Sequence, residues 1–426
     1  MSIIHDVAYD HYGHRVATCS SDQTIRIYDS AGNKTAEWRA HSGSIWRLSW
    51  AHPEFGVALA SCSFDRRICI WEENVDAEEA ALLLAADNGA LPVAQPPAGG
   101  KASSSQWMLR KELSDARDSV VDVQFAPHHL DQLLLASCGA DGVVRVYEAP
   151  DVLDLGSWVP HSDFDAASAA VESAAEVAAA GGGAVGATSG AGFGMGSDAG
   201  PTGLSGVGGP SALLPGSAMG AAGGAVSATG AAPGMLGLGG SGGGGGSHSG
   251  SVEPLCLAWG TAFAEAPMLV VGMSDGHVLL WMFEEMHKQW VRSRAFGAMR
   301  CHSDCVRGVS WASDMGRSYQ LIATASRDRT VKLWALHRRV SGDEACVTAT
   351  SGGGAGGGGG GGGEKGGPGS WTGSCIAELS HRSQVWRVQW NASGSMLATS
   401  EDDGSVKIYR QDASGGWRHA EPVGPP

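Results

Sequence analysis

An aspartate followed six positions later by tryptophan or tyrosine recurs six times along this chain of 426 residues, each time across a turn and a strand. The six pairs are Asp22/Tyr28, Asp65/Trp71, Asp141/Tyr147, Asp275/Trp281, Asp328/Trp334 and Asp403/Tyr409. A fixed offset inside units of about 40–45 residues is typical of a β-propeller, in which each unit forms one blade. The sequence therefore predicts an all-β fold of six blades.

Each unit also shows the strand pattern of a blade. A short alternating run ends in an aromatic residue, as in Val388-Gln389-Trp390, and a second apolar run follows, as in Leu397–Ser400. Alternation with β-branched and aromatic residues predicts strands, and the Asp-Gly or Asp-Arg pairs supply turn residues. A further tryptophan near the expected outer strand of most units predicts where the blade ends.

A recurring polar set points to the WD-repeat type of propeller, in which such residues form a buried hydrogen-bond network. Its members are His41, Ser61, Asp65 and Trp71 in the second unit, His302, Thr324, Asp328 and Trp334 in the fifth, and His381, Thr399 and Asp403 in the sixth. The same residue types form hydrolase triads, but a catalytic site is single and needs an exposed nucleophile. Because the set recurs, we interpret it as structural and expect no catalytic residues.

Composition divides the chain into folded and unfolded parts. We expect residues 1–160 to form blades 1–3 with a loop at about 75–105, and residues 251–420 to form blades 4–6 with a Gly-rich loop at 341–370. Residues 161–250, rich in Ala, Gly and Ser, are predicted to be a disordered insertion, and 421–426 a flexible tail. Ala169–Ala180 has helix propensity but offers only alanine for burial, so we predict disorder there too.

The remaining composition excludes several classes of function. The net charge of −15 and the absence of long Lys/Arg runs argue against direct nucleic-acid binding. No apolar span is long enough to cross a membrane, and no signal peptide is recognisable. The nine cysteines favour a reducing compartment and packing roles. Cys301 and Cys305 flank His302 without a second ligand pair at zinc spacing, so we expect neither a metal site nor a cofactor.

Six repeats on a geometry that often holds seven blades predict an open ring. The first strand begins near Ile3, and the C-terminal tail is too poor in strand formers to add a blade. Unpaired blade faces invite strand addition by another chain. We expect the gap to be lined by Ile4, Val7 and Tyr9 of blade 1 and by Val385, Val388 and Trp390 of blade 6. Two alternatives remain: a tightly closed six-bladed ring, and an ordinary inter-blade core role for these residues.

Several segments carry a specific resemblance. Ala40–Asp65 with Trp71-Glu72-Glu73 is similar to the second blade of the coat-type propellers, which include the SEH nucleoporin and its COPII outer-coat paralogue. Leu134–Trp158, with its Tyr147–Asp151 run, resembles the SEH member specifically. Further support comes from His5–Asp29, Gly316–Tyr319 and Ser380–Trp390.

The resemblance implies a structural scaffold role in the Y-shaped outer-ring complex of the nuclear pore, supporting transport of protein and mRNA. It implies that an α-solenoid nucleoporin inserts its N-terminal strands as a seventh blade, beside other pore scaffold proteins and without membrane insertion. It also leaves open a second location, a vacuolar or lysosomal coat-like complex that regulates TOR nutrient signalling.

Three other functions are less consistent with the sequence. A COPII coat propeller shares the second-blade segment but not the Tyr147–Asp151 run. A substrate receptor of a cullin ubiquitin ligase usually carries Trp-Asp-x-Arg after the third strand, whereas this chain has Tyr28-Asp29-Ser30-Ala31 and Trp71-Glu72-Glu73-Asn74. An enzyme is the least favoured class, since the triad-like residues recur.

Overall fold

The computed structural model describes residues 2–74, 106–127, 132–152, 154–181, 252–261, 266–297, 300–313, 316–338, 371–412 and 414–420. In these ranges the chain forms six four-stranded sheets, and each sheet uses four strands that are consecutive in sequence. The predicted insertion at 75–105, most of that at 161–250, the one at 341–370 and the tail at 421–426 lie outside the described residues. The sheets compose one compact unit, in which the predicted six-bladed propeller is confirmed.

The strands follow the predicted repeats. Blades 1 and 2 contain β1 (Ile4–Tyr9), β2 (Arg15–Ser20), β3 (Thr24–Asp29), β4 (Lys34–Arg39), β5 (Ile45–Trp50), β6 (Ala58–Ser63), β7 (Ile68–Asn74) and β8 (Gln106–Leu113). Blades 3 and 4 contain β9 (Val120–Phe125), β10 (Leu133–Gly139), β11 (Val143–Ala149), β12 (Val159–Asp165), β13 (Pro254–Trp259), β14 (Met268–Met273), β15 (Val278–Glu284) and β16 (Gln289–Ser293). Blades 5 and 6 contain β17 (Val306–Trp311), β18 (Gln320–Ser326), β19 (Thr330–Arg338), β20 (Trp371–Ser380), β21 (Val385–Trp390), β22 (Met396–Glu401), β23 (Val406–Gln411) and β24 (Trp417–His419).

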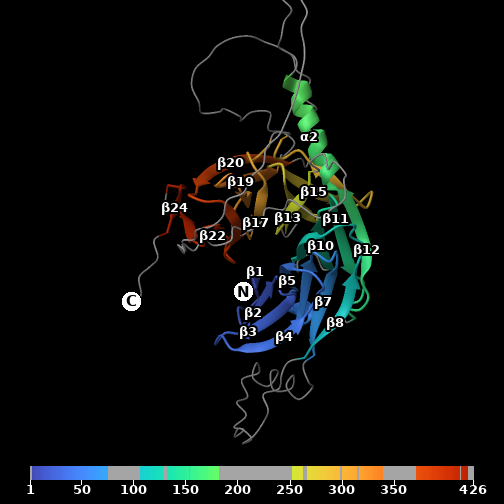
Figure 1. Ribbon diagram of the computed structural model, residues 1–426. Helices are drawn as coiled ribbons and strands as arrows, with labels where there is room; N and C mark the ends of the chain where they lie inside the picture. The colour runs from blue at the N-terminus through green and yellow to red at the C-terminus, as the bar shows by residue number, and fades with distance from the viewer. Residues whose placement is uncertain are drawn as a thin grey trace, which may run out of the picture. The chain divides into compact units, whose positions relative to one another are not determined.

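The first strand of every blade lies at the centre of the propeller. These inner strands pack in chain order, β1 on β5, β5 on β9, and so on to β17 on β21 (Figure 1). No comparable packing joins β21 to β1 within the described residues. Because no blade exchanges a strand with another, the ring is not closed by the two ends of this chain in the part that the structure describes.

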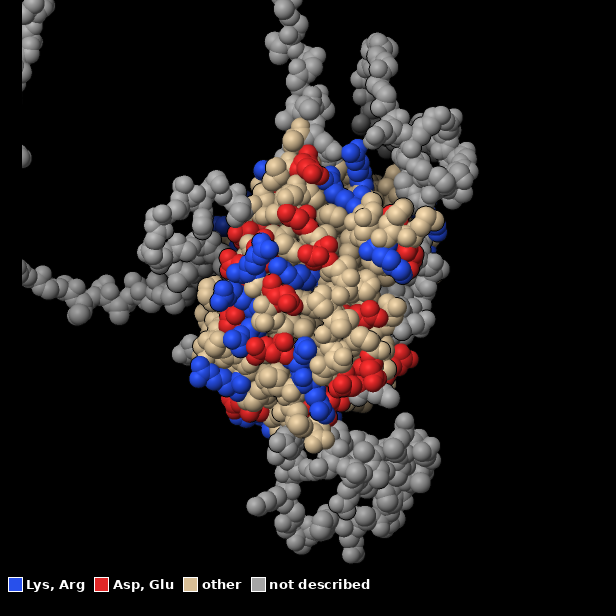
Figure 2. Space-filling model, turned by 90° about the vertical axis from the view of Figure 1, so that its right-hand side faces the viewer, with Lys and Arg blue, Asp and Glu red and all other residues tan. Residues whose placement is uncertain are grey.

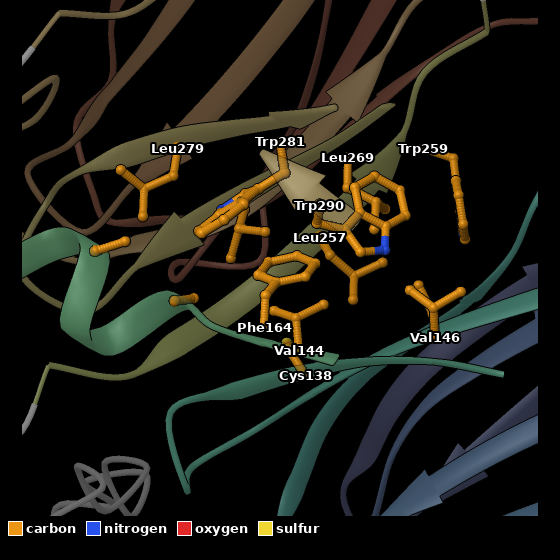
Figure 3. Close-up of a cluster of buried hydrophobic side chains, with 14 of the residues drawn as sticks. Cys138, Val144, Val146, Phe164, Leu257, Trp259, Leu269, Leu279, Trp281 and Trp290 are labelled. Carbon is orange, nitrogen blue, oxygen red and sulfur yellow. The ribbon is translucent and has the colours of Figure 1, made fainter. Parts of the chain in front are cut away.

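The hydrophobic core is divided among the blade interfaces. Five clusters of buried side chains fill the five spaces between consecutive blades, from blades 1 and 2 to blades 5 and 6. Figure 3 shows the one between blades 3 and 4, where Val144, Val146 and Phe164 approach Leu257 and Trp281. Face-to-face packing of apolar, alternating strands explains why each repeat needs a neighbour to bury its side chains.

The boundary predicted at residue 160 is wrong. β12 continues to Asp165, and α2 (Ala166–Gly181) follows it without a break. Phe164 is buried with its ring centroid 4.2 Å from that of Trp281, which anchors the strand. Asp165 caps the helix, since its carboxylate accepts hydrogen bonds from the backbone N–H and the hydroxyl of Ser168.

The first turns of α2 are buried although they are rich in alanine. Ala166, Ala169 and Ala170 belong to the core between blades 3 and 4, and the Arg292 guanidinium donates to the Ala169 carbonyl at 2.7 Å. Small side chains let the helix backbone come close to the sheets. Alanine therefore provides a packing surface here without a stripe of larger apolar residues. The predicted disorder of residues 161–181 is therefore corrected to an outer strand and a helix.

Candidate partner-binding site

Every blade has two faces, and equivalent residues of different blades can be compared directly. We call the face that packs on the blade before it the preceding face, and the opposite one the following face. The following face is built from the second and third strands, and its members in blade 5 are Leu321, Ala323, Val331 and Leu333. The equivalents in blade 6, at the same offsets from the repeat aspartate, are Met396, Ala398, Val406 and Ile408.

The following face of blade 6 is apolar but exposed. Val406 is 66% exposed and Ile408 44%, whereas the residues at these two positions in blades 1–5 are at most 3% exposed. The buried equivalents are Ile25, Ile68, Val144, Val278 and Val331 for the first position, and Ile27, Ile70, Val146, Leu280 and Leu333 for the second. Blade 6 thus has the same kind of surface that every other blade buries under its successor.

The preceding face of blade 1, which has no earlier blade to cover it in the described part of the chain, is exposed as well. Tyr9 ends the inner strand and is 66% exposed. Four of its five equivalents, Phe125, Trp259, Trp311 and Trp390, are at most 8% exposed, and the fifth, Trp50, is partly buried. Val7, two residues earlier, is 50% exposed. In the sheet Val7 pairs with Thr18 and Tyr9 with Val16, so these side chains form one surface. We call the two exposed faces together the open seam.

A cavity of about 870 Å³ runs along the inner strands and reaches the open seam. Its lining includes Ile4, Val7 and Tyr9 from blade 1 and Gln389 and Val406 from blade 6. At its inner side the Arg387 guanidinium lies 3.3 Å from a carboxylate oxygen of Asp6. This ion pair connects blades 1 and 6 through side chains, while their apolar faces remain uncovered.

The residues predicted to line the gap are exposed in blade 1 and buried in blade 6. Ile4, Val7 and Tyr9 are exposed on blade 1, as expected for a surface that faces the gap. Val385, Val388 and Trp390, in contrast, are buried against blade 5. Side chains alternate between the faces of a strand, so these three point away from the gap, and the prediction for blade 6 is wrong in this respect.

The residues that were missed on blade 6 are those of its following face. Met396, Ala398, Val406 and Ile408 all carry apolar side chains at positions that alternate with the buried Leu397 and Tyr409. The comparison of equivalent positions identifies this face once the structure shows that the positions of Val406 and Ile408 are buried in blades 1–5 and exposed in blade 6.

The polar set of blades 2 and 5 forms the predicted network. In blade 2, His41 Nδ1 lies 3.1 Å from Asp65 Oδ2 and Nε2 lies 2.8 Å from Ser61 Oγ, which also accepts the indole N–H of Trp71 at 3.0 Å. The equivalent distances in blade 5, among His302, Asp328, Thr324 and Trp334, are 3.0, 2.7 and 3.0 Å. Ser61 is fully buried, which agrees with a structural and not a nucleophilic role.

Blade 6 departs from this arrangement. His381 Nδ1 lies 3.1 Å from Glu401 Oε1, and Asp403 is exposed, with its carboxylate accepting from Ser405 N–H. Thr399 is buried and its hydroxyl approaches the Lys407 carbonyl, as the equivalent hydroxyls of blades 2 and 5 approach theirs, but His381 Nε2 has no partner among the described residues. The expectation that Asp403 joins the network is corrected: the longer side chain of Glu401, two residues earlier, reaches the histidine instead.

The network makes stability depend on pH. Burial alone raises the pKa of the Asp328 carboxyl, but hydrogen bonds from His302, Thr330 and the Ser303 backbone hold it well below its usual range. A carboxyl with a lower pKa in the folded state stabilises the fold above its unfolded pKa of about 3.9, and this contribution is lost as the pH falls.

We therefore expect Asp328→Asn to lower the free energy of unfolding by about 2 kcal/mol at pH 7, and by less at pH 3, where part of the contribution is already lost. Urea denaturation at the two pH values measures the difference. Asp403→Asn, at the exposed equivalent in blade 6, should change stability little at either pH. A cost of Asp328→Asn that is the same at both pH values would contradict the proposed ionised network.

The described part of the chain contains no arrangement of metal ligands. No group of three or more His, Cys, Asp or Glu side chains there has the arrangement of a metal site. Cys301 and Cys305 are buried, and burial raises the pKa of both thiols. No helix within the described ranges is long and apolar enough to span a bilayer.

The six-bladed β-propeller and the hydrogen-bond network of blades 2 and 5 have the features of WD repeats, and the open seam is an uncovered apolar surface. The WD domain, G-beta repeat family matches residues 2–29, 32–72, 294–335 and 373–410, which cover blades 1, 2, 5 and 6. Blades 3 and 4, outside those matches, have the same four-stranded architecture.

Comparison with known proteins confirms the resemblance drawn from the sequence. The chain is 29% identical to nucleoporin SEH1-B of Xenopus laevis and 28% identical to nucleoporin SEH1 of Homo sapiens, each over 98% of this chain and 84% of the relative. Nucleoporin SEH1 of Danio rerio is 29% identical over 98% of this chain and 83% of its own length. The similarity thus extends along nearly the whole chain.

Proposed function

We propose that this protein is a structural nucleoporin of the outer ring of the nuclear pore, where an α-solenoid nucleoporin completes its propeller in trans. One observation carries the proposal: the positions of Val406 and Ile408 are buried in blades 1–5 and exposed in blade 6, and the aromatic residue Tyr9 is exposed where four of its five equivalents are buried. A contiguous apolar surface of this kind is typical of a protein-binding site. The similarity to SEH1 nucleoporins supports the choice of pore scaffold as the class of assembly.

A scaffold role also fits the surface charge. On the side of the molecule shown in Figure 2, Lys and Arg alternate with Asp and Glu and form no continuous basic patch. With a net charge of −15, the chain has no electrostatic attraction to nucleic acid. Its support of protein and mRNA transport therefore follows from assembly with other pore scaffold proteins at the nuclear envelope, without catalysis.

The proposal predicts a stable complex between the full chain and an N-terminal segment of the solenoid nucleoporin long enough for one blade, about 40–45 residues. Co-purification and calorimetry measure binding, and hydrogen exchange locates it. Amides of β1, β22 and β23 should exchange more slowly in the complex, because the seam is then covered.

Two results would count against the proposal. One is the failure of purified chain and segment to associate. The other is free chain in which β1, β22 and β23 are already as protected as their equivalents in blades 2–5, since the seam would then be covered without a partner. Recovery from cells with vesicle-coat or vacuolar components in place of pore components would reassign the assembly.

A further inference from the structure

Consecutive blades are joined at the centre by a repeated hydrogen bond. In three of the five pairs of consecutive blades, the residue before the closing aromatic of an inner strand accepts, through its side chain, the backbone N–H of the closing aromatic in the next blade. Ala8 and Ala258, at this position in blades 1 and 4, have no side-chain acceptor. Ser49 Oγ accepts from Phe125 N at 2.9 Å, Gln124 Oε1 from Trp259 N at 3.1 Å, and Ser310 Oγ from Trp390 N at 3.3 Å. We call this residue the acceptor position.

A second bond reinforces the first where the closing aromatic is tryptophan. The indole N–H of Trp259 donates to the backbone carbonyl of Gln124 at 3.0 Å, and that of Trp390 to the carbonyl of Ser310 at 3.2 Å. Trp50 likewise donates to the carbonyl of Ala8 at 3.0 Å. Trp311 differs, because its indole donates to Gln320 within its own blade. In four of the five blade pairs the acceptor position therefore holds the next blade through its side chain, its carbonyl or both, and the pair of blades 4 and 5 is the exception.

Gln389 occupies the acceptor position of blade 6. Its side chain is exposed and lines the cavity at the open seam, and no later blade follows it in the described part of the chain. It is also the same residue type as Gln124, which makes both bonds to Trp259. The pair of Gln124 and Trp259, between blades 3 and 4, therefore indicates which kind of residue Gln389 can bind.

The contacts also fix the direction of an incoming strand. Asp6 accepts a hydrogen bond from Leu48 N, and Ala8, two residues later in β1, accepts one from the indole of Trp50, two residues later in β5. The contacts therefore follow both strands in the same order. In the same way Asp122 accepts from Leu257 N, two residues before the contact at Trp259. Neighbouring inner strands therefore run in the same direction.

From this repetition we infer that the strand entering the seam runs parallel to β21 and places a tryptophan against Gln389, with its backbone N–H on the amide oxygen and its indole N–H on the main-chain carbonyl. The inference depends on the proposed function, since it describes the chemistry of the proposed partner strand. It adds a sequence requirement: an apolar alternating segment of the partner that ends in tryptophan.

The test compares variants of Gln389 with the full chain and the N-terminal solenoid segment. Gln389→Leu removes the side-chain acceptor and should weaken affinity about tenfold. Gln389→Ser restores an acceptor of the type found at Ser49 and Ser310 and should recover most of that loss. Gln124→Leu, the matched change inside the ring, should lower the melting temperature and leave partner affinity nearly unchanged.

The partner side is tested by replacing each tryptophan of the segment with phenylalanine. One of these changes should weaken binding about tenfold, and its effect should shrink when it is combined with Gln389→Leu. The ¹⁵N-labelled indole N–H of that tryptophan should become protected from exchange in the complex. A segment that binds without a tryptophan near Gln389, or equal affinities for the leucine and serine variants, would overturn the inference while leaving the proposed function intact. Absence of binding by wild-type chain would instead refute the proposed function.

Discussion

Replacing Ile408 with aspartate should weaken binding of the solenoid segment at least about 100-fold and leave the free propeller as stable as the wild type. Ile408 is 44% exposed in the free chain, so a carboxylate at that position stays hydrated. In a complex that covers the following face of blade 6, the same carboxylate would be buried without a partner. Burying an unpaired charge costs several kcal/mol, and each 1.4 kcal/mol is about a factor of ten in affinity.

Two matched variants make this result interpretable. Leu333 is the equivalent of Ile408 in blade 5 and is fully buried, so Leu333→Asp should prevent folding or strongly lower the melting temperature. Ile376, an exposed residue of the outer strand β20, should tolerate aspartate without loss of stability or affinity. If Ile408→Asp destabilises the free chain as much as Leu333→Asp does, another part of the chain already covers this face. If it binds like the wild type, the partner does not use the seam.

The repeats could be predicted from the sequence because the constraints that make a blade are local. The Asp-Gly turn and the aromatic six residues later stand on one hairpin, as with Asp141 and Tyr147 across β10 and β11. Such signals depend on the strand period and on turn residues, not on distant contacts. They gave the number of blades and most of the network in blades 2 and 5.

The exposed face could not be identified in the same way. Strands of blade 6 have apolar side chains on both faces, like those of the buried blades, so their pattern alone does not say which face has no neighbour. Val388 and Ile408 are equally apolar, yet the first is buried against blade 5 and the second is exposed. Only the order of the blades around the ring distinguishes them.

Two other errors came from rules that are correct on average. The alanine-rich sequence around Ala169 predicts disorder because it offers no apolar stripe for burial, but Phe164 and Asp165 place a helix there directly against blades 3 and 4. The regular offset predicts Asp403 in the network of blade 6, but Glu401 lies nearer to His381 in space. In both cases a neighbouring side chain, invisible to the repeat pattern, determines the local structure.

The network of blade 5 should contribute more to stability than that of blade 6. His302 bonds through both ring nitrogens, to Asp328 and Thr324, and its side chain is fully buried. His302→Ala leaves a carboxylate that is almost entirely buried without its principal partner, and it leaves a buried hydroxyl with fewer bonds. Removing a hydrogen-bond partner of a buried carboxylate costs about 3 kcal/mol. We therefore expect the urea midpoint to fall markedly, with an unchanged slope.

His381→Ala is the comparison that isolates this effect, since it removes the same side chain in blade 6. His381 Nε2 has no partner among the described residues, and Glu401 keeps its ion pair with Lys407 when the histidine is removed. The expected loss is about 1 kcal/mol, the value of one net hydrogen bond. Equal losses for the two variants would mean that packing volume, which both substitutions remove alike, governs the effect. A larger loss for His302→Ala would show that hydrogen bonding through both ring nitrogens of the histidine stabilises blade 5. It would also show that the network contributes less to the stability of blade 6, next to the open seam.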